Sequence, residues 1–331
     1  MIDKSIFEYL EMPGGRFRDR LDPKVADWVQ PVQDSKVGQA RNQFDCALMG
    51  APLSKTSISH SAASRLPDAI RQAFQALTPY SLEYKLALNE VMKVVDFGNV
   101  RMHTTDLSKN QQRIEDTVFT YWRSSSSPLV LLGGDHSITG ASVLGYVRST
   151  GKRLGIIHFD AHHDVRNLED GGRTNGTPFR TILSSGLVQG HRVVQIGLRD
   201  FVNAKVYHEY VLNHGVTVFT ARDVVRKGVS NLLAEAMEFA SKDTDAVYVS
   251  FDMDVLDQSF VPGVPAPSPG GMTVWDALDA LTWLGRQPNV KMVDVVCADP
   301  VQDVRDLTTR VAANLILSFW TGMALREPGR V

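Results

Sequence analysis

Cysteine is scarce in this chain, which excludes a disulfide framework as the source of its stability. Only Cys46 and Cys297 occur among 331 residues, and both lie in strand-like stretches. Disulfide-stabilised domains are typically short, secreted and much richer in cysteine. Residues 1–5 also begin no signal-peptide pattern. We therefore expect two reduced thiols in a cytoplasmic protein.

Long apolar runs and a strong excess of one charge are also missing. No apolar run reaches the roughly 18 residues that a membrane helix needs, so we expect no membrane partner. A net charge of −2 gives no electrostatic reason to expect nucleic acid. The apolar fraction of 43% and the charged fraction of 22% are ordinary for a globular protein with a large core. A small molecule is the expected ligand.

Short apolar runs alternate along the chain with stretches in which apolar residues recur every three or four positions. The runs predict buried strands and the periodic stretches predict helices. The expected strands are 44–50, 92–97, 128–132, 154–159, 192–197, 216–219, 246–251 and 290–296, and the expected helices are 65–77, 109–122, 138–147, 204–212, 229–240, 274–284 and 309–320. This alternation predicts a three-layer α/β/α fold with a mostly parallel sheet of about eight strands.

No linker or internal repeat divides the sequence, so we expect a single domain over residues 1–331. Folds of the α/β class reach this length as one domain. Residues 1–43 are largely polar and irregular, and we expect them to form an N-terminal arm or cap. Residues 44–322 would then form the core.

Two acidic segments separated by about ninety residues are the most informative feature of the sequence. Asp160-Ala161-His162-His163-Asp164 follows one expected strand, and Asp252-Met253-Asp254 follows another. Gly133-Gly134-Asp135-His136-Ser137 follows a third strand. Ligands of parallel α/β sheets bind beyond the carboxyl ends of the strands, where all three segments are expected to lie.

The side chains in these segments have the chemistry of a metal site. Crowded carboxylates repel one another and take up protons unless a cation holds them. A single aspartate after a strand, such as Asp135, is more often a helix cap. Four carboxylates and two imidazoles exceed the needs of one ion and suit two ions that share ligands. Such an oxygen-rich set favours Mn²⁺ over zinc and leaves Fe²⁺, Co²⁺ and Ni²⁺ open. Two adjacent ions can hold a hydroxide that is nucleophilic at neutral pH.

The three segments together resemble the metal motifs of the ureohydrolase superfamily, which includes arginases, agmatinases and formimidoylglutamases. The resemblance spans about residues 44–322 and implies an arginase-like fold, two Mn²⁺ ions per subunit and a homo-oligomer, usually a trimer or hexamer. It implies catalytic roles for Asp164, which would pass a proton to the leaving amine, and for Asp254. The implied ligands are His136, Asp160, Asp164 and Asp252 for one ion, and Asp160, His162, Asp252 and Asp254 for the other.

Two departures from the superfamily pattern count against arginine and agmatine as substrates. Asn175 stands where arginases and agmatinases usually have a histidine. Cys297, three residues before Pro300, stands where a guanidinium-binding glutamate is usual. An amide and a thiol do not replace a buried carboxylate as the partner of a permanently charged guanidinium.

Other residues resemble the formimidoylglutamases within this superfamily. The similar strings are Gly176-Thr177-Pro178-Phe179, the Arg166 that follows the metal motif, and residues 266–271. The resemblance implies hydrolysis of N-formimino-L-glutamate to L-glutamate and formamide, a step of histidine degradation. This substrate carries two carboxylates, so the site should be cationic. Arg166 is the main candidate for binding a carboxylate, with Asn175 and Thr177 as further substrate-binding candidates.

Several alternatives stay open at this point. The protein could be an agmatinase or another guanidino-acid hydrolase that releases urea, or an inactive metal-binding protein. Residues 50–56 superficially resemble a phosphate-binding loop, but the second glycine before the lysine is missing, which makes a nucleotide-binding protein the weaker reading. Arg166 could also pair with Glu169 or Asp170 on a surface loop. Cys297 could be an inert core thiol.

Overall fold

The computed structural model describes residues 19–32 and 44–326, and a parallel nine-stranded sheet runs through its centre. The strand order is β1-β5-β2-β6-β11-β10-β7-β8-β9, and every pairing is parallel. The strands are β1 Gln30–Pro31, β2 Cys46–Gly50, β5 Val94–Asn99, β6 Leu129–Leu132, β7 Leu154–Phe159, β8 Val193–Leu198, β9 Thr217–Thr220, β10 Ala246–Asp252 and β11 Val290–Val296. β3 Tyr80–Ser81 and β4 Leu86–Ala87 form a separate antiparallel pair.

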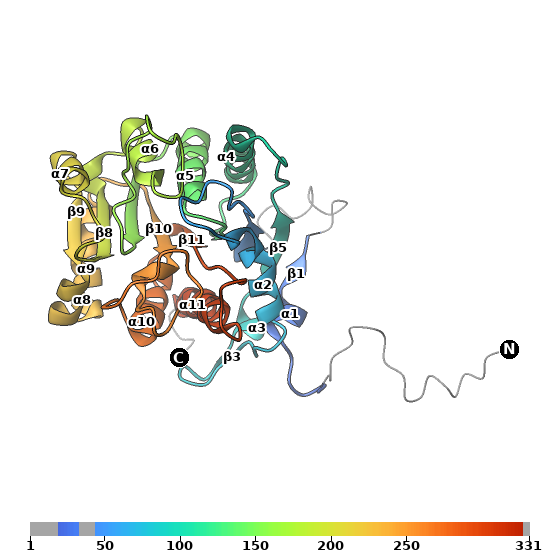
Figure 1. Cartoon of the computed structure of the whole chain (residues 1–331). Helices are drawn as coiled ribbons and strands as arrows, with labels where there is room; N and C mark the ends of the chain where they lie inside the picture. Colours follow the sequence, from blue (N-terminus) through green and yellow to red (C-terminus); the bar gives the residue numbers. More distant parts are fainter. Residues whose placement is uncertain (1–18, 33–43, 327–331) are drawn as a thin grey trace.

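Helices cover both faces of the sheet (Figure 1). Each face has its own apolar core. One face carries α4 Leu107–Ser124, α5 Ser137–Thr150, α6 Pro178–Ser184 and α7 Lys205–Asn213. The opposite face carries α1 Val25–Trp28, α2 Leu66–Ala73, α3 Leu88–Val91, α8 Ala221–Lys227, α9 Val229–Ser241, α10 Val274–Gly285 and α11 Leu307–Ala324. None of the helices in the described ranges combines the length and the hydropathy of a membrane span.

The predicted α/β/α class is confirmed, and all eight expected strands are present with ends within two residues of the prediction. Their buried apolar runs explain this agreement. The ninth strand, β1, lies in the expected arm and pairs with β5 at the edge of the sheet. β1 consists of two exposed residues and is too short to show a periodic apolar pattern in the sequence. It contains Pro31, which is tolerated in an edge strand.

The expected single domain remains a prediction. Residues 1–18 and 33–43 of the arm lie outside the described residues.

Four central strands bring the sequence motifs together. In space they lie in the order β6-β11-β10-β7, although β7 follows β6 directly in the chain. The later strands β10 and β11 are thus inserted between them. Because all four are parallel, their carboxyl ends open at the same edge of the sheet. The segments that follow β6, β7 and β10 meet there.

Candidate functional site

The turn after β6 places His136 at the centre of this edge. Gly134 allows the turn to press against another loop, because a Cβ there would lie 1.8 Å from the Leu53 carbonyl oxygen. The carboxylate of Asp135 accepts hydrogen bonds from Thr56 Oγ1 at 2.6 Å and from the Ser137 backbone N–H at 3.0 Å. Asp135 therefore anchors the start of α5, as expected for a single aspartate after a strand, and leaves His136 to face the site.

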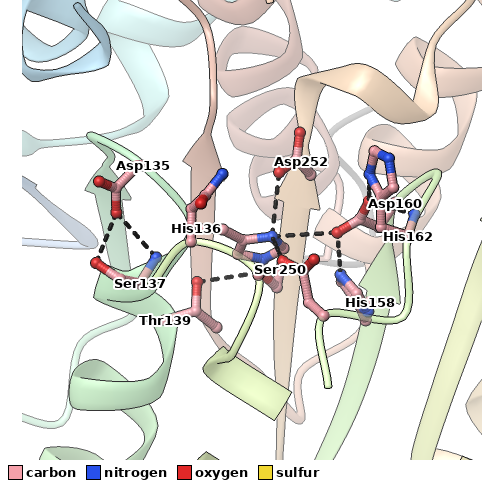
Figure 2. A network of polar contacts seen from close by, with 12 residues as sticks. Asp135, His136, Ser137, Thr139, His158, Asp160, His162, Ser250 and Asp252 are labelled. Carbon is pink, nitrogen blue, oxygen red and sulfur yellow. Dashed lines mark hydrogen bonds and ion pairs between the residues drawn. The ribbon is translucent and has the colours of Figure 1, made fainter. Parts of the chain in front are cut away.

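Three carboxylates surround Nδ1 of His136, and Figure 2 labels two of them, Asp160 and Asp252. The nitrogen lies 3.1 Å from Asp160 Oδ2, 2.8 Å from Asp164 Oδ2 and 3.1 Å from Asp252 Oδ2. None of these approaches has the geometry of a hydrogen bond, so the buried nitrogen has no hydrogen-bond partner among the described residues. A single N–H could not serve three carboxylates in any case. One nitrogen and three oxygens converging on a point are instead arranged as ligands of a cation.

A second cluster forms around His162. Its Nδ1 lies 3.2 Å from Asp160 Oδ1 and 3.1 Å from Asp254 Oδ2. Asp160 thus contacts His136 through one oxygen and His162 through the other, which is the arrangement of a carboxylate shared by two ions. Backbone contacts hold the remaining oxygens, since Asp254 Oδ1 accepts from the Ala161 N–H at 3.1 Å and Asp252 Oδ1 from the Asp254 N–H at 3.0 Å.

Both clusters contain an excess of buried negative charge, which bound cations would neutralise. Burial, followed by the nearby Asp254 and Asp160, raises the pKa of Asp252 to about 8. Burial and Asp160 raise the pKa of Asp164 to about 6. Burial lowers the pKa of His162, but Asp254 and Asp160 outweigh it and raise that pKa to about 12. Protons are bound here because negative charge is concentrated, and divalent cations would displace them.

A row of four polar side chains crosses the sheet directly beneath this site, and sequence reasoning missed it as a unit. Asp294 of β11, Ser250 of β10, His158 of β7 and Gln195 of β8 are neighbours in strand register, and all are fully buried. His136 Nε2 lies 2.9 Å from Ser250 Oγ. The sequence signal that could have revealed this row is the presence of one of these polar residues inside each of the four expected buried strands.

His158 of β7 is fully buried and has partners at both ring nitrogens. Nδ1 accepts from Gln195 Nε2 at 3.1 Å, and Nε2 lies 2.8 Å from Asp160 Oδ2. Its ring stacks on Phe179 with the centroids 3.9 Å apart. His158 therefore supports the shared carboxylate of Asp160 as well as filling the core.

The loop between the metal motif and α6 carries the three predicted substrate-binding residues. The backbone N–H of Arg166 donates to the Gly176 carbonyl at 2.9 Å, while its side chain is exposed. Within the described ranges Arg166 forms no ion pair, so the alternative pairing with Glu169 or Asp170 is absent. Arg180 of α6 is engaged by Tyr210, whose ring centroid lies 3.4 Å from the guanidinium carbon of Arg180.

Asn175 and Thr177 differ in how their side chains are hydrogen-bonded within the protein. Asn175 Oδ1 accepts from the Ile58 N–H at 2.8 Å, which ties the loop to the segment after β2. Thr177 is buried, and its hydroxyl donates to the Thr174 carbonyl and accepts from the Thr174 N–H. The hydroxyl of Thr177 thus closes the loop, and its role as a substrate contact remains a prediction.

Cys297 lies in the wall of the site, at the end of β11. Its sulfur lies within 4.8 Å of ligand atoms of His136 and Asp252. Burial, followed by Asp252 and Asp254, raises its pKa well above the ordinary value, so the group is a neutral thiol. Cys46 is also free and buried, in agreement with the expectation of two reduced thiols.

Comparisons with known proteins agree with this geometry. The model of the family described as "Arginase family" matches residues 44–321. A formimidoylglutamase of Halalkalibacterium halodurans is 41% identical over 325 residues, covering 98% of this chain and 99% of that protein. A formimidoylglutamase of Bacillus subtilis is 38% identical over 322 residues, covering 96% and 98%. A mitochondrial agmatinase of Gallus gallus is 31% identical over 290 residues, covering 87% and 82%.

Solved structures show the same relationship. The crystal structure of formimidoylglutamase from Bacillus subtilis superposes with a TM-score of 0.91 at 37% identity, covering 97% of this chain and 98% of that one. Trypanosoma cruzi formiminoglutamase, solved with Mn²⁺, superposes with a TM-score of 0.83 at 25% identity, covering 92% and 100%. From its sequence and its fold, this chain belongs to the arginase family.

Proposed function

We propose that this protein is a metal-dependent hydrolase of a linear amidine C–N bond that converts N-formimino-L-glutamate and water to L-glutamate and formamide. The carrying observation is similarity to two formimidoylglutamases over almost the whole of both chains, at 41% and 38% identity. The agmatinase relative is less similar and is covered over 82% of its length. Asn175 and Cys297, in place of residues suited to guanidines, favour the same substrate.

The donor set fits two Mn²⁺ ions. His136 Nδ1 with Asp160, Asp164 and Asp252 would hold the first, and His162 Nδ1 with Asp160, Asp252 and Asp254 the second. Mostly oxygen donors with two imidazoles suit manganese, and the Trypanosoma cruzi neighbour was solved with this metal. When bound, the ions would supply Lewis acidity and a nucleophile derived from water at neutral pH.

Asp164 is the proposed proton carrier to the departing amine of glutamate. Its backbone adopts a left-handed conformation with φ of 52°, which the chain holds by hydrogen bonds from the Phe179 and Arg180 N–H groups to the Asp164 carbonyl. This anchoring fixes one carboxylate oxygen beside His136. A carboxylate at the edge of the cluster is suited to moving a proton in general acid–base catalysis.

Arg166 is the proposed carboxylate-binding group, because its side chain is exposed and has no ion-pair partner in the part of the chain that the structure describes. A guanidinium and a carboxylate form paired, charge-assisted hydrogen bonds. Asn175 is the proposed polar contact in the same loop. Its Oδ1 already holds the Ile58 N–H, so its amide NH₂ is the group that can face the substrate.

Assembly and location are also proposals. The family resemblance supports a homo-oligomer, a trimer or a hexamer, which light scattering of the purified protein would measure. Two free, buried cysteines are consistent with a reducing, cytoplasmic environment.

The deciding experiment assays Mn²⁺-loaded protein with formiminoglutamate, agmatine, arginine and guanidinobutyrate, and separates formamide from urea among the products. We expect formamide from formiminoglutamate alone. Urea release from a guanidino compound would overturn the proposed substrate. Absence of turnover on all four compounds by protein that binds both ions would identify an inactive metal-binding member of the family.

A further inference from the structure

A hydroxyl and a carboxylate lie behind His136, on the side away from the metal-binding oxygens. Ser250 of β10 and Asp294 of β11 are register partners on adjacent strands, and neither has any exposed surface. Ser250 Oγ lies 2.9 Å from His136 Nε2 (Figure 2) and 2.8 Å from Asp294 Oδ1. The three buried groups form a continuous polar chain.

The surroundings of Asp294 fix the direction of these hydrogen bonds. Its Oδ2 accepts from Thr139 Oγ1 and from Tyr248 OH, each at 2.6 Å. Its Oδ1 accepts from Ser250 Oγ at 2.8 Å and from the Phe251 N–H at 3.3 Å. Four donors match the acceptor capacity of an ionised carboxylate, which has no proton to give. The single hydroxyl proton of Ser250 therefore points to Asp294, and a lone pair of its oxygen faces His136.

This direction decides which nitrogen of His136 carries a proton. Ser250 Oγ can only accept from the imidazole, so Nε2 must donate. A neutral imidazole carries one ring proton, which leaves a lone pair on Nδ1. That lone pair faces the oxygens of Asp160, Asp164 and Asp252 at 2.8–3.1 Å, where a cation would complete the arrangement.

We infer that Ser250, oriented by Asp294, is a positioning residue that holds His136 in the Nε2-protonated tautomer and so presents Nδ1 as a metal ligand. The inference rests on the proposed metal-dependent function. Outer partners of metal-binding histidines orient the ring, and their loss costs about 10–100-fold in metal affinity. The loss should fall on the ion that His136 holds.

The second imidazole has no comparable support, which makes the effect specific to one ion. The side chain of His162 is 25% exposed, and its Nδ1 contacts Asp160 and Asp254. Across residues 19–32 and 44–326, no protein group hydrogen-bonds to His162 Nε2. Disrupting Ser250 should therefore separate two ions that otherwise bind as a pair.

The test compares two variants, each of which removes one of the hydroxyl groups that donate a hydrogen bond to Asp294. Ser250→Ala removes the group between Asp294 and His136, whereas Tyr248→Phe removes a donor to the other oxygen and leaves His136 untouched. Ser250→Thr keeps a hydroxyl at the position. Bound Mn²⁺ per chain would be measured by elemental analysis after dialysis, metal affinity by calorimetry, and coupling between the ions by electron paramagnetic resonance. Thermal unfolding of the metal-free proteins would report general destabilisation.

We expect Ser250→Ala to bind its weaker ion about 10–100-fold less tightly than the unaltered protein. It should retain about one Mn²⁺ and show the spectrum of an isolated ion. Tyr248→Phe and Ser250→Thr should retain two ions and the coupled spectrum. Asp294→Ala, which frees the Ser250 proton to turn towards His136, should lose the ion at least as completely as Ser250→Ala.

Two outcomes would overturn the inference. One is that Ser250→Ala keeps both ions with unchanged affinity, and the other is that Tyr248→Phe loses metal to the same extent, which would indicate a general packing effect. Failure of the proposed function is separately visible, because the unaltered protein would then bind no manganese pair or would hydrolyse no amidine.

Discussion

The metal-binding strand ends and the loop of residues 165–177 differ in how their side chains are held. At the strand ends, His136, Asp160, Asp252 and Asp254 are buried, and their spare atoms are fixed by backbone N–H groups or by polar side chains in neighbouring strands. In the loop, Arg166 extends its side chain into solvent. Groups that must hold a fixed geometry lie on the rigid sheet, and groups that select a substrate lie on the adaptable connection.

The largest expected effect comes from the strand ends. Asp254→Asn keeps an acceptor for the Ala161 N–H but removes the charge beside His162. We expect kcat to fall by more than about 100-fold with loss of bound Mn²⁺, because a direct ligand matters at least as much as an outer partner. Steady-state assays and elemental analysis would measure this. Asp245→Asn, at an exposed aspartate paired with Arg153, is the control, and near-normal kcat in Asp254→Asn would contradict the assignment.

The loop should respond through substrate binding. Arg166→Ala is expected to raise KM by about tenfold to a hundredfold, since hydrogen bonds to charged groups contribute about 1.5–3 kcal/mol. Both ions should remain bound. The matched control is Arg173→Ala, an exposed arginine of the same loop. A fall in kcat with unchanged KM would place Arg166 outside the substrate site.

Removal of the metal should make stability depend on pH at the strand ends. The folded pKa of Asp252 is raised to about 8 from 3.8, and that of His162 to about 12 from 6.5. Between pH of about 6.5 and 8 the folded state therefore binds more protons than the unfolded state, so its stability falls as pH rises. Unfolding of chelator-treated protein over this pH range would measure the effect, and stabilisation by Mn²⁺ should grow with pH. A rise in metal-free stability over the same range would contradict this sign.

Thr177→Val should have the smallest effect. It removes the hydroxyl that closes the loop on Thr174, at a cost of about 1 kcal/mol in the free energy of unfolding. Chemical unfolding would measure the loss, while bound Mn²⁺ should stay unchanged. Ser184→Ala, at an exposed hydroxyl of α6, provides the control. Loss of metal in Thr177→Val would show that loop and strand ends are coupled.

Sequence reasoning was strong where the signal is local. Continuous apolar runs located the eight main strands, and the acidic motifs after them identified side chains that the structure brings within 2.8–3.2 Å of one another. It was weak where the outcome depends on how a short segment is held. Thr177 is a polar loop residue in the sequence, and only the fold shows that Thr174 occupies its hydroxyl.

By itself, the sequence determined the secondary structure and the kind of chemistry, because hydrophobic periodicity and the donor atoms of side chains are properties of a few neighbouring residues. The tertiary structure alone decided which residues stand beside one another. Asp294, Ser250, His158 and Gln195 lie in four different strands, and their alignment under the metal site depends on strand order and register. Those follow from packing the whole sheet between its helices, so no local pattern in the chain specifies them.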